Sequence, residues 1–371
     1  MTDASRDTLP TVPPLARSTL DRAAHRRTDP AWLAEAERSA RLLVVDTRSG
    51  GRTLVTGSPD RPRLVLLSSA DAPAAEPGRN GNRLFLGVEP DGVAVFAVDG
   101  PLPEVPGARP ASLRGVGHLL SDRDAGLFTT ALALANWHAA HPYSSATGLP
   151  TTVVDGGWSR VDPDGVQVWP RTDPAMIVLV TDGVAGPAGR FLLGRNAAWP
   201  ATGGLRRFSC LAGFVEPGES AEAAVVREVG EEVGIQPTDI RYVGSQAWPY
   251  PGSLMLGFFA TADPTQPLRL DPTEMAEARW FTRQEIAEIL AEPRQIDEWS
   301  LASAGRPQGN GGHDGQPGPA PSTDAAAPLP GGTGPSTDGA TPSTGGEALG
   351  SIGLPAPSSI AYFLITRWLR G

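Results

Sequence analysis

The sequence predicts an α/β protein in which a small β-rich N-terminal domain precedes a second domain of alternating strands and helices. Four short apolar runs separated by turn residues support the first domain, because such runs are typical of strands. They lie at 43–46, 63–67, 83–87 and 92–98. A longer apolar run at 174–183 predicts a strand that is buried on both faces and begins the second domain.

Changes in composition divide the chain further. A helix is expected over 122–141, where an acidic start precedes apolar residues at helical spacing. Gly, Pro, Ser, Thr and Ala dominate residues 302–350, which cannot bury enough apolar area to offset their ordering entropy. The predicted segments are a flexible arm (1–30), the N-terminal domain (31–141), a turn-rich hairpin segment (142–170), the second domain (171–301), a disordered insertion (302–350) and a helix that completes the second domain (351–371).

Two helix signals support these boundaries near the C-terminus. The pattern "TRQE" at 282–285 is typical of a capping box that opens a helix. Ile360, Leu364 and Trp368 are spaced four residues apart, which indicates an amphipathic helix after the biased segment. We therefore interpret 302–350 as an insertion before the last helix rather than as a tail.

The bulk composition limits the function classes. A formal net charge of -10 argues against sequence-independent binding of nucleic acid, which needs Lys and Arg to neutralise phosphates. The single cysteine, Cys210, excludes an intramolecular disulfide and a thiolate zinc cluster. No apolar run approaches the roughly 20 residues of a membrane-spanning helix, and the charged N-terminus does not match a signal peptide. We expect a cytoplasmic protein with no membrane partner.

The segment "GFVEPGESAEAAVVREVGEEVGI" (213–235) predicts a helix with an unusual charge distribution. Ser220 is a good N-cap and Gly234 a good C-terminal stop. Glu228, Glu231 and Glu232 crowd the final turns beside an apolar stripe, although like charges at this spacing repel one another. An acidic, solvated face is the ordinary explanation of such a pattern, and a bound cation is the alternative.

The spacing from Gly213 onward, G-x5-E-x7-R-E-V-x-E-E-x-G-I, resembles the signature of the Nudix hydrolases. The resemblance implies a Nudix α/β/α sandwich over residues 171 to about 300 plus the terminal helix. It also implies that Mg²⁺ or Mn²⁺, hard cations that prefer oxygen ligands, neutralise a pyrophosphate and activate a water. Glu219 and Arg227 match the pair that fixes the loop against the helix.

The same resemblance implies the residues of the metal centre. Glu228, Glu231 and Glu232 match the catalytic glutamates of the family, with Glu232 as metal ligand and candidate base. The full implied ligand set is Glu228, Glu231, Glu232, Glu274 and the backbone carbonyl of Ala212.

A second motif, "SQAWPYPGS" at 245–253, resembles the SQPWPFPxS array of the NADH pyrophosphatase branch of this family. Two positions depart from the array, with Ala247 for a proline and Tyr250 for a phenylalanine. From the residues alone, the rings of the loop could equally stack on a planar base or pack onto their own domain. The implied substrate-binding residues are Gln246, Ala247, Trp248, Pro249, Tyr250, Pro251, Gly252 and Ser253, together with Arg114, Trp169, Phe214 and Ala361.

The chain departs from this branch at its zinc ribbon. The four positions where the branch carries zinc ligands are Ser144, Thr147, Asp162 and Gly165, and none supplies a thiolate or an imidazole. We therefore expect no zinc, and a hairpin that folds through turn chemistry and apolar packing instead. Gly157 stands where the branch has an acidic residue, so one substrate contact is missing.

The expected function is metal-dependent hydrolysis of the pyrophosphate of NADH or NAD⁺ to nicotinamide mononucleotide and AMP. The alternatives are another substrate such as ADP-ribose, removal of an NAD cap from RNA ends, a sensor that binds a nucleotide without cutting it, and a paralogue of low activity. The resemblance also implies a homodimer whose active site is completed across the interface.

Overall fold

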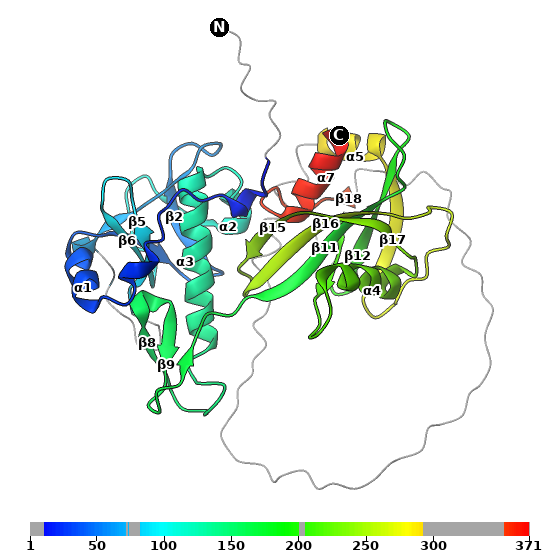
Figure 1. Cartoon of the computed structure of the whole chain (residues 1–371). Helices are drawn as coiled ribbons and strands as arrows, with labels where there is room; N and C mark the ends of the chain where they lie inside the picture. Colours follow the sequence, from blue (N-terminus) through cyan, green and yellow to red (C-terminus); the bar gives the residue numbers. More distant parts are fainter. Residues whose placement is uncertain (1–10, 72, 74–81, 200–204, 292–351, 371) are drawn as a thin grey trace, which may run out of the picture.

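The computed structural model of the chain describes residues 11–71, 73, 82–199, 205–291 and 352–370. Two domains lie side by side, the N-terminal domain in blue to cyan and the C-terminal domain in green to red (Figure 1). The predicted insertion at 302–350 lies outside the described residues. Within the described ranges, every helix is too short or too polar to span a bilayer.

Two small sheets form the N-terminal domain, with strand orders β4-β1-β6-β5 and β3-β2-β7. The four predicted strand regions are confirmed, although the run at 63–67 divides into two short strands. β1 and β6 pair in parallel from Arg41↔Val95 to Val45↔Asp99, so both are apolar and buried. The strands are β1 (Arg41–Val45), β2 (Arg52–Thr56), β3 (Arg63–Leu64), β4 (Leu67–Ser68), β5 (Leu84–Val88), β6 (Ala94–Asp99) and β7 (Arg109–Ser112).

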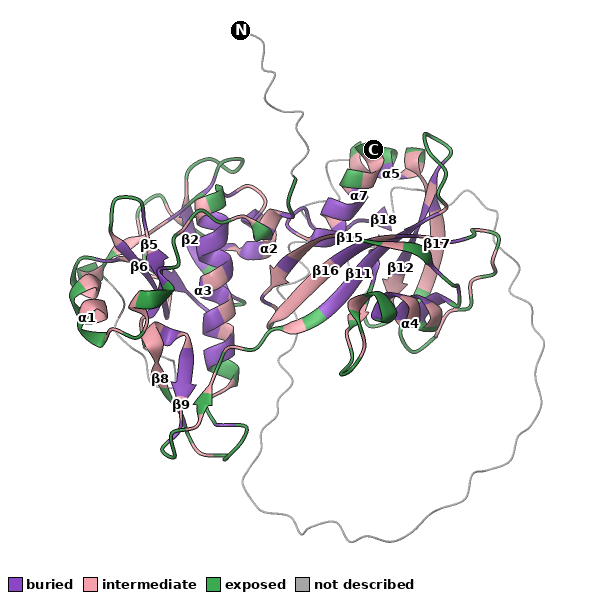
Figure 2. Ribbon diagram, in the orientation of Figure 1, coloured by how far each residue is buried: buried purple, intermediate pink, exposed green. Residues whose placement is uncertain are grey.

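The long helix α3 (Asp122–Ala140) packs against these strands, as Figure 2 shows by its mostly buried colour. Its N-cap is Ser121, whose hydroxyl accepts from the backbone N–H of Asp124 at 3.2 Å. The Asp124 carboxylate in turn accepts from the N–H of Leu64 at 3.0 Å, which ties β3 to the helix. The smaller helices of this domain are α1 (Pro30–Arg38), α2 (Leu113–Val116) and the 3-10 turn η3 (Ser69–Asp71).

The hairpin segment folds into three short antiparallel strands, β8 (Thr152–Val154), β9 (Ser159–Val161) and β10 (Gln167–Val168). The 3-10 turn η4 (Asp155–Gly157) joins the first two. Gly157 has φ 91°, and a Cβ there would lie 2.6 Å from the Leu84 side chain, so the missing acidic residue would not fit this backbone.

Hydrogen bonds join three of the four positions where the resembled branch carries zinc ligands. Thr147 Oγ1 donates to Asp162 Oδ2 at 2.6 Å, and the backbone N–H of Thr147 donates to Ser144 Oγ at 3.4 Å. Asp162 Oδ1 accepts from the N–H groups of Asp164 and Val166 at 3.1 and 2.8 Å. Ser144 and Asp162 are buried, so these hydrogen bonds hold the hairpin segment together in its interior.

A second set of hydrogen bonds attaches the hairpin to α3. His138 Nε2 donates to the carbonyl of Gly157 at 2.9 Å, and His138 Nδ1 accepts from Arg160 at 3.0 Å. Arg160 also donates to the hydroxyl and carbonyl of Thr151 at 2.6 and 2.8 Å. Burial is the main cause that lowers the pKa of His138 to about 4, so the imidazole is neutral and can accept from Arg160.

The C-terminal domain is a three-layer α/β/α sandwich. Its sheet has the order β15-β16-β11-β12-β17, and β14 pairs with the β11 edge that faces away from β16. Met176 and Val178 of β11 pack toward α4 (Ala221–Val233), whereas Ile177 and Leu179 pack toward α5 (Arg283–Ala291) and α7 (Ile360–Arg370). The strands are β11 (Asp173–Thr181), β12 (Arg190–Asn196), β14 (Leu211–Phe214), β15 (Thr238–Trp248), β16 (Ser253–Thr261) and β17 (Met275–Thr282).

The C-terminal segment joins the same domain, as predicted. β18 (Ile352–Gly353) pairs in parallel with β13 (Arg206–Arg207), and α7 then covers one face of the sheet. The predicted capping box is also confirmed, because the N–H of Thr282 donates to Glu285 Oε2 at 2.7 Å and the N–H of Glu285 donates to Thr282 Oγ1 at 3.2 Å.

Residues 11–29 correct the expectation of a flexible arm. They run over both domains and include the 3-10 turns η1 (Pro14–Ala16) and η2 (Ala24–Arg26). Leu15 is buried, and its N–H donates to Gln246 of β15 at 3.0 Å. The sequence signal failed here because single apolar residues between prolines and arginines can pack without any periodic pattern.

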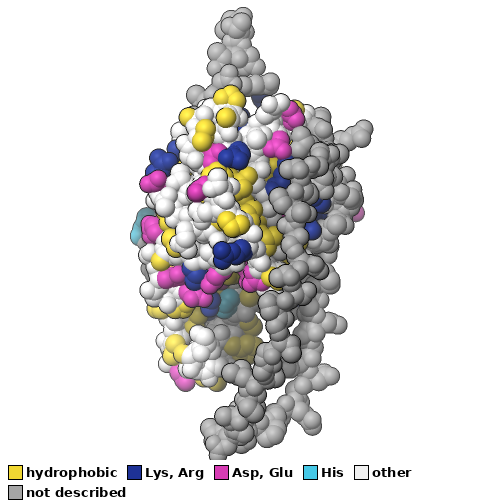
Figure 3. Space-filling view, turned by 90° about the vertical axis from the view of Figure 1, so that its right-hand side faces the viewer, with side chains coloured by type: hydrophobic (Ala, Val, Ile, Leu, Met, Phe, Trp, Pro, Cys, Tyr) yellow, Lys and Arg dark blue, Asp and Glu magenta, His cyan; other side chains and the backbone are white. Residues whose placement is uncertain are grey.

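The exposed face of the C-terminal domain carries both signs of charge. Figure 3 shows acidic and basic side chains close together on this face, with hydrophobic side chains between them. This mixture, rather than a basic surface, agrees with the formal net charge of -10.

We predict that Asp162→Ala lowers the melting temperature by about 2–4 °C, because the substitution removes three hydrogen-bond acceptor contacts from a buried site. Calorimetry of the variant beside Asp164→Ala, an exposed carboxylate of the same turn, measures this effect. A zinc chelator should leave the melting temperature of the unmodified protein unchanged. A lower melting temperature after the chelator is added would contradict the view that hydrogen bonds, and not zinc, hold the hairpin segment together.

Candidate functional site

Helix α4 is fixed at both ends and along its apolar face. Ser220 Oγ accepts from the N–H of Ala223 at 3.1 Å, and Gly234 ends the helix in the left-handed region with φ 72°. Val225 and Val229 are fully buried against β11 and its neighbours. Both predicted caps are confirmed, and the helix is a rigid support for its glutamates.

Two of those glutamates are buried. The residue exposures are 8% for Glu228 and 5% for Glu232. A Cβ added to Gly213 of β14 would overlap the Glu228 carboxylate, so only a glycine lets this side chain lie against the strand. Glu232 Oε2 is buried and has no hydrogen-bond partner among the described residues.

The electrostatics of the pair follow from this burial. Desolvation, followed by repulsion from Glu228 and Glu274, raises the pKa of Glu232 to about 8. Desolvation also raises the pKa of Glu228, while the guanidinium of Arg227 opposes that shift. Both shifts favour the protonated carboxyls, so ionising the pair in this buried place is costly.

Arg227 supplies the positive charge beside this centre. Its guanidinium lies 2.6 Å from Glu219 Oε1, 3.0 Å from Glu228 and 3.1 Å from Glu231. It also donates to the carbonyl of Phe214 at 2.9 Å, so one side chain joins the loop before α4 to the helix. Glu231 is exposed and also pairs with Arg227, so one guanidinium joins the carboxylates of Glu228 and Glu231.

Two further residues of the implied ligand set lie near Glu232. Glu274, directly before β17, is close enough to raise the pKa values of Glu228 and Glu232. Ala212 and Glu232 together line a small cavity of about 100 Å³. Among the described residues, no three Asp, Glu, His or Cys side chains already form a metal cage. The unpartnered oxygen, the carboxylate donors and the glycine cradle nevertheless fit a hard divalent cation.

The aromatic loop 245–253 lies between the two domains. Trp248 and Tyr250 pack against the core of the N-terminal domain, with ring centroids 5.0 Å apart. The Arg114 guanidinium lies 3.9 Å from the Tyr250 ring centroid and 5.3 Å from that of Trp248. The N–H of Arg114 also donates to the Tyr250 hydroxyl at 3.2 Å. The structure thus brings Arg114 and both rings together.

Gln246 connects three distant segments. Its side-chain carbonyl accepts from the N–H of Leu15, and its amide donates to the carbonyl of Ser358 at 3.0 Å. His118 of the N-terminal domain contacts the Ser358 hydroxyl, also at 3.0 Å. The N-terminal segment, β15 and the residues just before α7 therefore meet at one buried amide.

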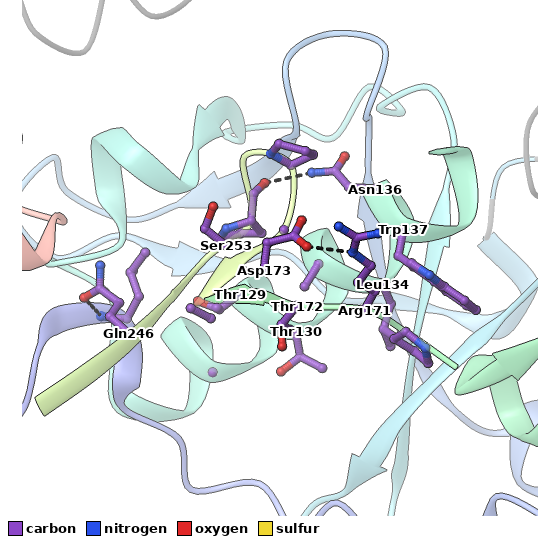
Figure 4. A pocket seen from close by; sticks show the side chains of 18 of the residues that line it. Thr129, Thr130, Leu134, Asn136, Trp137, Arg171, Thr172, Asp173, Gln246 and Ser253 are labelled. Carbon is purple, nitrogen blue, oxygen red and sulfur yellow. Dashed lines mark hydrogen bonds and ion pairs between the residues drawn. The ribbon is translucent and has the colours of Figure 1, made fainter. Parts of the chain in front are cut away.

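The remaining implied substrate residues lie on several different elements. Phe214 and Trp169 are exposed by 60% and 63%, and their rings are available to a ligand. Ala361 is buried on α7, with its carbonyl 3.9 Å from Cys210 Sγ. Ala247, Pro249, Pro251, Gly252 and Ser253 line a cavity of about 630 Å³ between the domains (Figure 4).

Sequence reasoning did not include α3 in any site. Thr130, Trp137 and His141 of this region line the cavity opposite the aromatic loop, and Asn136 donates to the Pro249 carbonyl at 2.8 Å. Their spacing is ordinary helical periodicity, which predicts a packed helix and carries no signal of a ligand.

Comparison with known proteins agrees with this architecture. Residues 171–300 match the family model of the NUDIX domain, and residues 36–137 match that of the NADH pyrophosphatase-like rudimentary NUDIX domain. The chain is 43% identical over 301 residues to a protein of Mycobacterium tuberculosis named NAD-capped RNA hydrolase NudC, covering 80% of this chain and 89% of that protein.

Similarity extends to a relative from a distant organism. The human NAD-capped RNA hydrolase NUDT12 is 37% identical over 187 residues, which cover 47% of this chain and 38% of that protein. A NUDIX hydrolase structure from Nitrosomonas europaea covers 38% of this chain and 78% of that chain at 19% identity, with a TM-score of 0.31.

We predict that Gln246→Leu lowers the free energy of unfolding by about 1–3 kcal/mol, because it leaves the Leu15 N–H and the Ser358 carbonyl without their partner. Denaturant titration measures the change. Gln167→Leu, at an exposed position of β10, is the control and should cost less. Equal stability of the two variants would show that the buried amide does not hold the three segments together.

Proposed function

The chain belongs to the Nudix hydrolase family, in the branch with a rudimentary N-terminal Nudix domain, and on this premise we propose that it hydrolyses the pyrophosphate bond of NADH or NAD⁺. The products are nicotinamide mononucleotide and AMP. The observation that carries the proposal is the buried pair Glu228 and Glu232 beside Gly213, with one carboxylate oxygen unpartnered. The names of the relatives support an NAD moiety as the substrate group.

The proposed cofactor is Mg²⁺ or Mn²⁺, held by Glu228, Glu231, Glu232, Glu274 and the carbonyl of Ala212. When bound, such a cation neutralises the pyrophosphate and lowers the pKa of the attacking water. Zinc has no proposed role, because Ser144, Thr147 and Asp162 already satisfy one another by hydrogen bonds.

The chain's own residues have distinct tasks in this proposal. Glu232 is the candidate base, since its buried oxygen, which has no hydrogen-bond partner among the described residues, can accept a proton from the water. Arg227 and Glu219 keep the loop that carries Phe214 against α4. Phe214 and Trp169 are the proposed stacking surfaces for a base, where Trp169 replaces a tyrosine of the branch and loses its hydroxyl.

The aromatic loop has a proposed role in specificity through its position. Arg114 and the Trp248 and Tyr250 rings fix the loop between the domains, and residues 251–253 then lead into β16. One edge of β11 pairs with β16 and the other edge pairs with β14. Ser253 on β16 and Phe214 on β14 therefore lie on opposite sides of β11. We propose that the loop end and Ala361 of α7 complete the dinucleotide site.

NAD-capped RNA is a second candidate substrate, favoured by the name of the mycobacterial relative. The negative net charge of the chain predicts that the protein recognises the cap itself and binds the following RNA weakly. We also propose that the enzyme is cytoplasmic and works as a homodimer.

Glu232→Gln and Glu228→Gln should each lower kcat for NADH at least about 100-fold, because each removes a negative charge from the buried centre. Turnover with Mg²⁺ or Mn²⁺ is the measurement, with the melting temperature as a check of folding. Glu222→Gln, an exposed glutamate in the first turn of α4, should keep normal turnover. Full activity in either buried variant would refute the assignment of the centre.

A product-identified assay over NADH, NAD⁺, ADP-ribose and NAD-capped RNA should show cleavage of the NAD-containing substrates to mononucleotide products. Decapping should change little between 50 and 200 mM salt, roughly the range over which phosphate-binding proteins lose affinity steeply. Faster cleavage of ADP-ribose than of NADH would reassign the substrate. NADH that stays intact with either metal would indicate a sensor.

A further inference from the structure

An N-terminal strap, residues 13–21, is attached to each of the two domains. At the C-terminal domain, Leu15 is buried, and its N–H donates to Gln246 Oε1 of β15 at 3.0 Å. At the N-terminal domain, the carbonyl of Asp21 accepts from the N–H of Val88 in β5 at 2.8 Å. Figure 1 shows the segment in dark blue, where it passes over α3 between these two contacts. A segment with only one short 3-10 turn is thus held by both domains.

Glycines of the N-terminal domain make room for the strap. A Cβ added at Gly117 would overlap the Leu15 side chain. A Cβ at Gly126 would lie 2.5 Å from Ser18 Oγ and 2.9 Å from Ser18 Cα, closer than packed atoms can approach. Gly126 is inside α3, where glycine is less favourable than alanine. The space that the strap needs explains a glycine at this helical position.

One arginine attaches the middle of the strap to the N-terminal domain. The Nε of Arg17 donates to the Pro14 carbonyl at 2.8 Å, within the strap itself. Its two terminal nitrogens donate to the Gly117 carbonyl and to the Asp122 carboxylate, both at 2.9 Å. Hydrogen bonds from a charged donor are stronger than those between neutral groups. Arg17 therefore holds the strap at the corner between α2 and α3.

The strap also adjoins the start of the aromatic loop. Residues 15–18 and residues 245–247 line the same cavity of about 630 Å³ between the domains. In Figure 4, Gln246 lies where the N-terminal segment passes this cavity. The Gln246 side chain is 1% exposed, and its carbonyl accepts from the Leu15 N–H. Without the strap, this buried carbonyl would lose its partner, and the loop would lose one of the contacts that fix it.

From these contacts we propose that the N-terminal strap positions the aromatic loop for dinucleotide binding, with Leu15 and Arg17 as positioning residues. The inference rests on the proposed function, because the role of residues 245–253 in substrate binding is part of that proposal. A loop that is fixed before the substrate arrives loses less conformational entropy on binding, so the strap lowers KM. In the part of the chain that the structure describes, no hydrogen bond joins the strap to α4, so kcat does not depend on it.

Leu15→Asp in the full-length protein tests the strap directly. A charge does not stay in the buried position of Leu15, so the strap is displaced. KM for NADH should rise about threefold to tenfold, because the loop must then be ordered when the substrate binds, while kcat stays within about twofold. Val12→Asp is the matched control, since Val12 is exposed and lies just before the strap. Melting temperatures show whether each variant folds.

Gly126→Ala tests the strap from the opposite side of the contact. The substitution adds one Cβ against Ser18 and at the same time improves the helix propensity of α3. A weakened helix therefore cannot explain its effect, and KM for NADH should rise as it does in Leu15→Asp. Gly100→Ala is the control, because a Cβ there would meet Pro73 at an ordinary 3.4 Å and should leave KM unchanged.

Hydrogen exchange supplies a measurement that a general loss of stability would not reproduce. In Leu15→Asp and Gly126→Ala, the amides of residues 246–253 should exchange at least about fivefold faster, while those of residues 225–233 in α4 keep their rates. Unchanged exchange in the loop, unchanged KM in both variants, or a lower kcat with unchanged KM would each overturn the proposal. The exchange measurement needs neither metal nor turnover. A protein that leaves NADH intact would therefore refute the proposed function, and the exchange rates would still decide whether the strap holds the loop.

Discussion

The candidate site depends on two carboxylates, Glu228 and Glu232, that are buried beside a strand without enough positive charge or hydrogen bonds to balance them. Taking an ionised carboxylate out of water is costly unless it is paired and hydrogen-bonded. Arg227 balances Glu228 from one side, but Glu232 Oε2 has no described partner. The packing of α4 and the absence of a Cβ at Gly213 hold both groups in place despite this cost. A bound cation would relieve the repulsion, so the strain in the free protein and its affinity for a metal have the same origin.

The second constraint is the interface between the domains. Arg114, Asn136 and Leu15 all contact residues 246–250, although they come from three different parts of the chain. Each contact satisfies a backbone group or covers a ring, and together they fix the loop that leads into β16. The N-terminal domain therefore holds the loop that precedes β16 in the C-terminal domain.

Local signals predicted much of the fold, and contacts between distant segments account for what they missed. Ser220, Gly234 and the "TRQE" box fix helix ends through nearest neighbours, and the structure confirms them. The packing of residues 11–29 and the position of Arg114 on two rings depend on partners far away in sequence. The interdomain cavity is of the same kind, since no single segment contains the pattern that creates it.

Two sets of polar residues show why the presence of donors alone does not define a metal site. At the hairpin, Asp162 accepts from Thr147, Asp164 and Val166, so its oxygens are satisfied within the chain and a metal would have to displace existing bonds. At α4, Glu232 Oε2 is equally buried and has none of these bonds. Buried polar groups are normally satisfied, so an exception on a rigid helix indicates a missing partner. The contrast supports both the expectation of no zinc at the hairpin and the proposal of a divalent cation at α4.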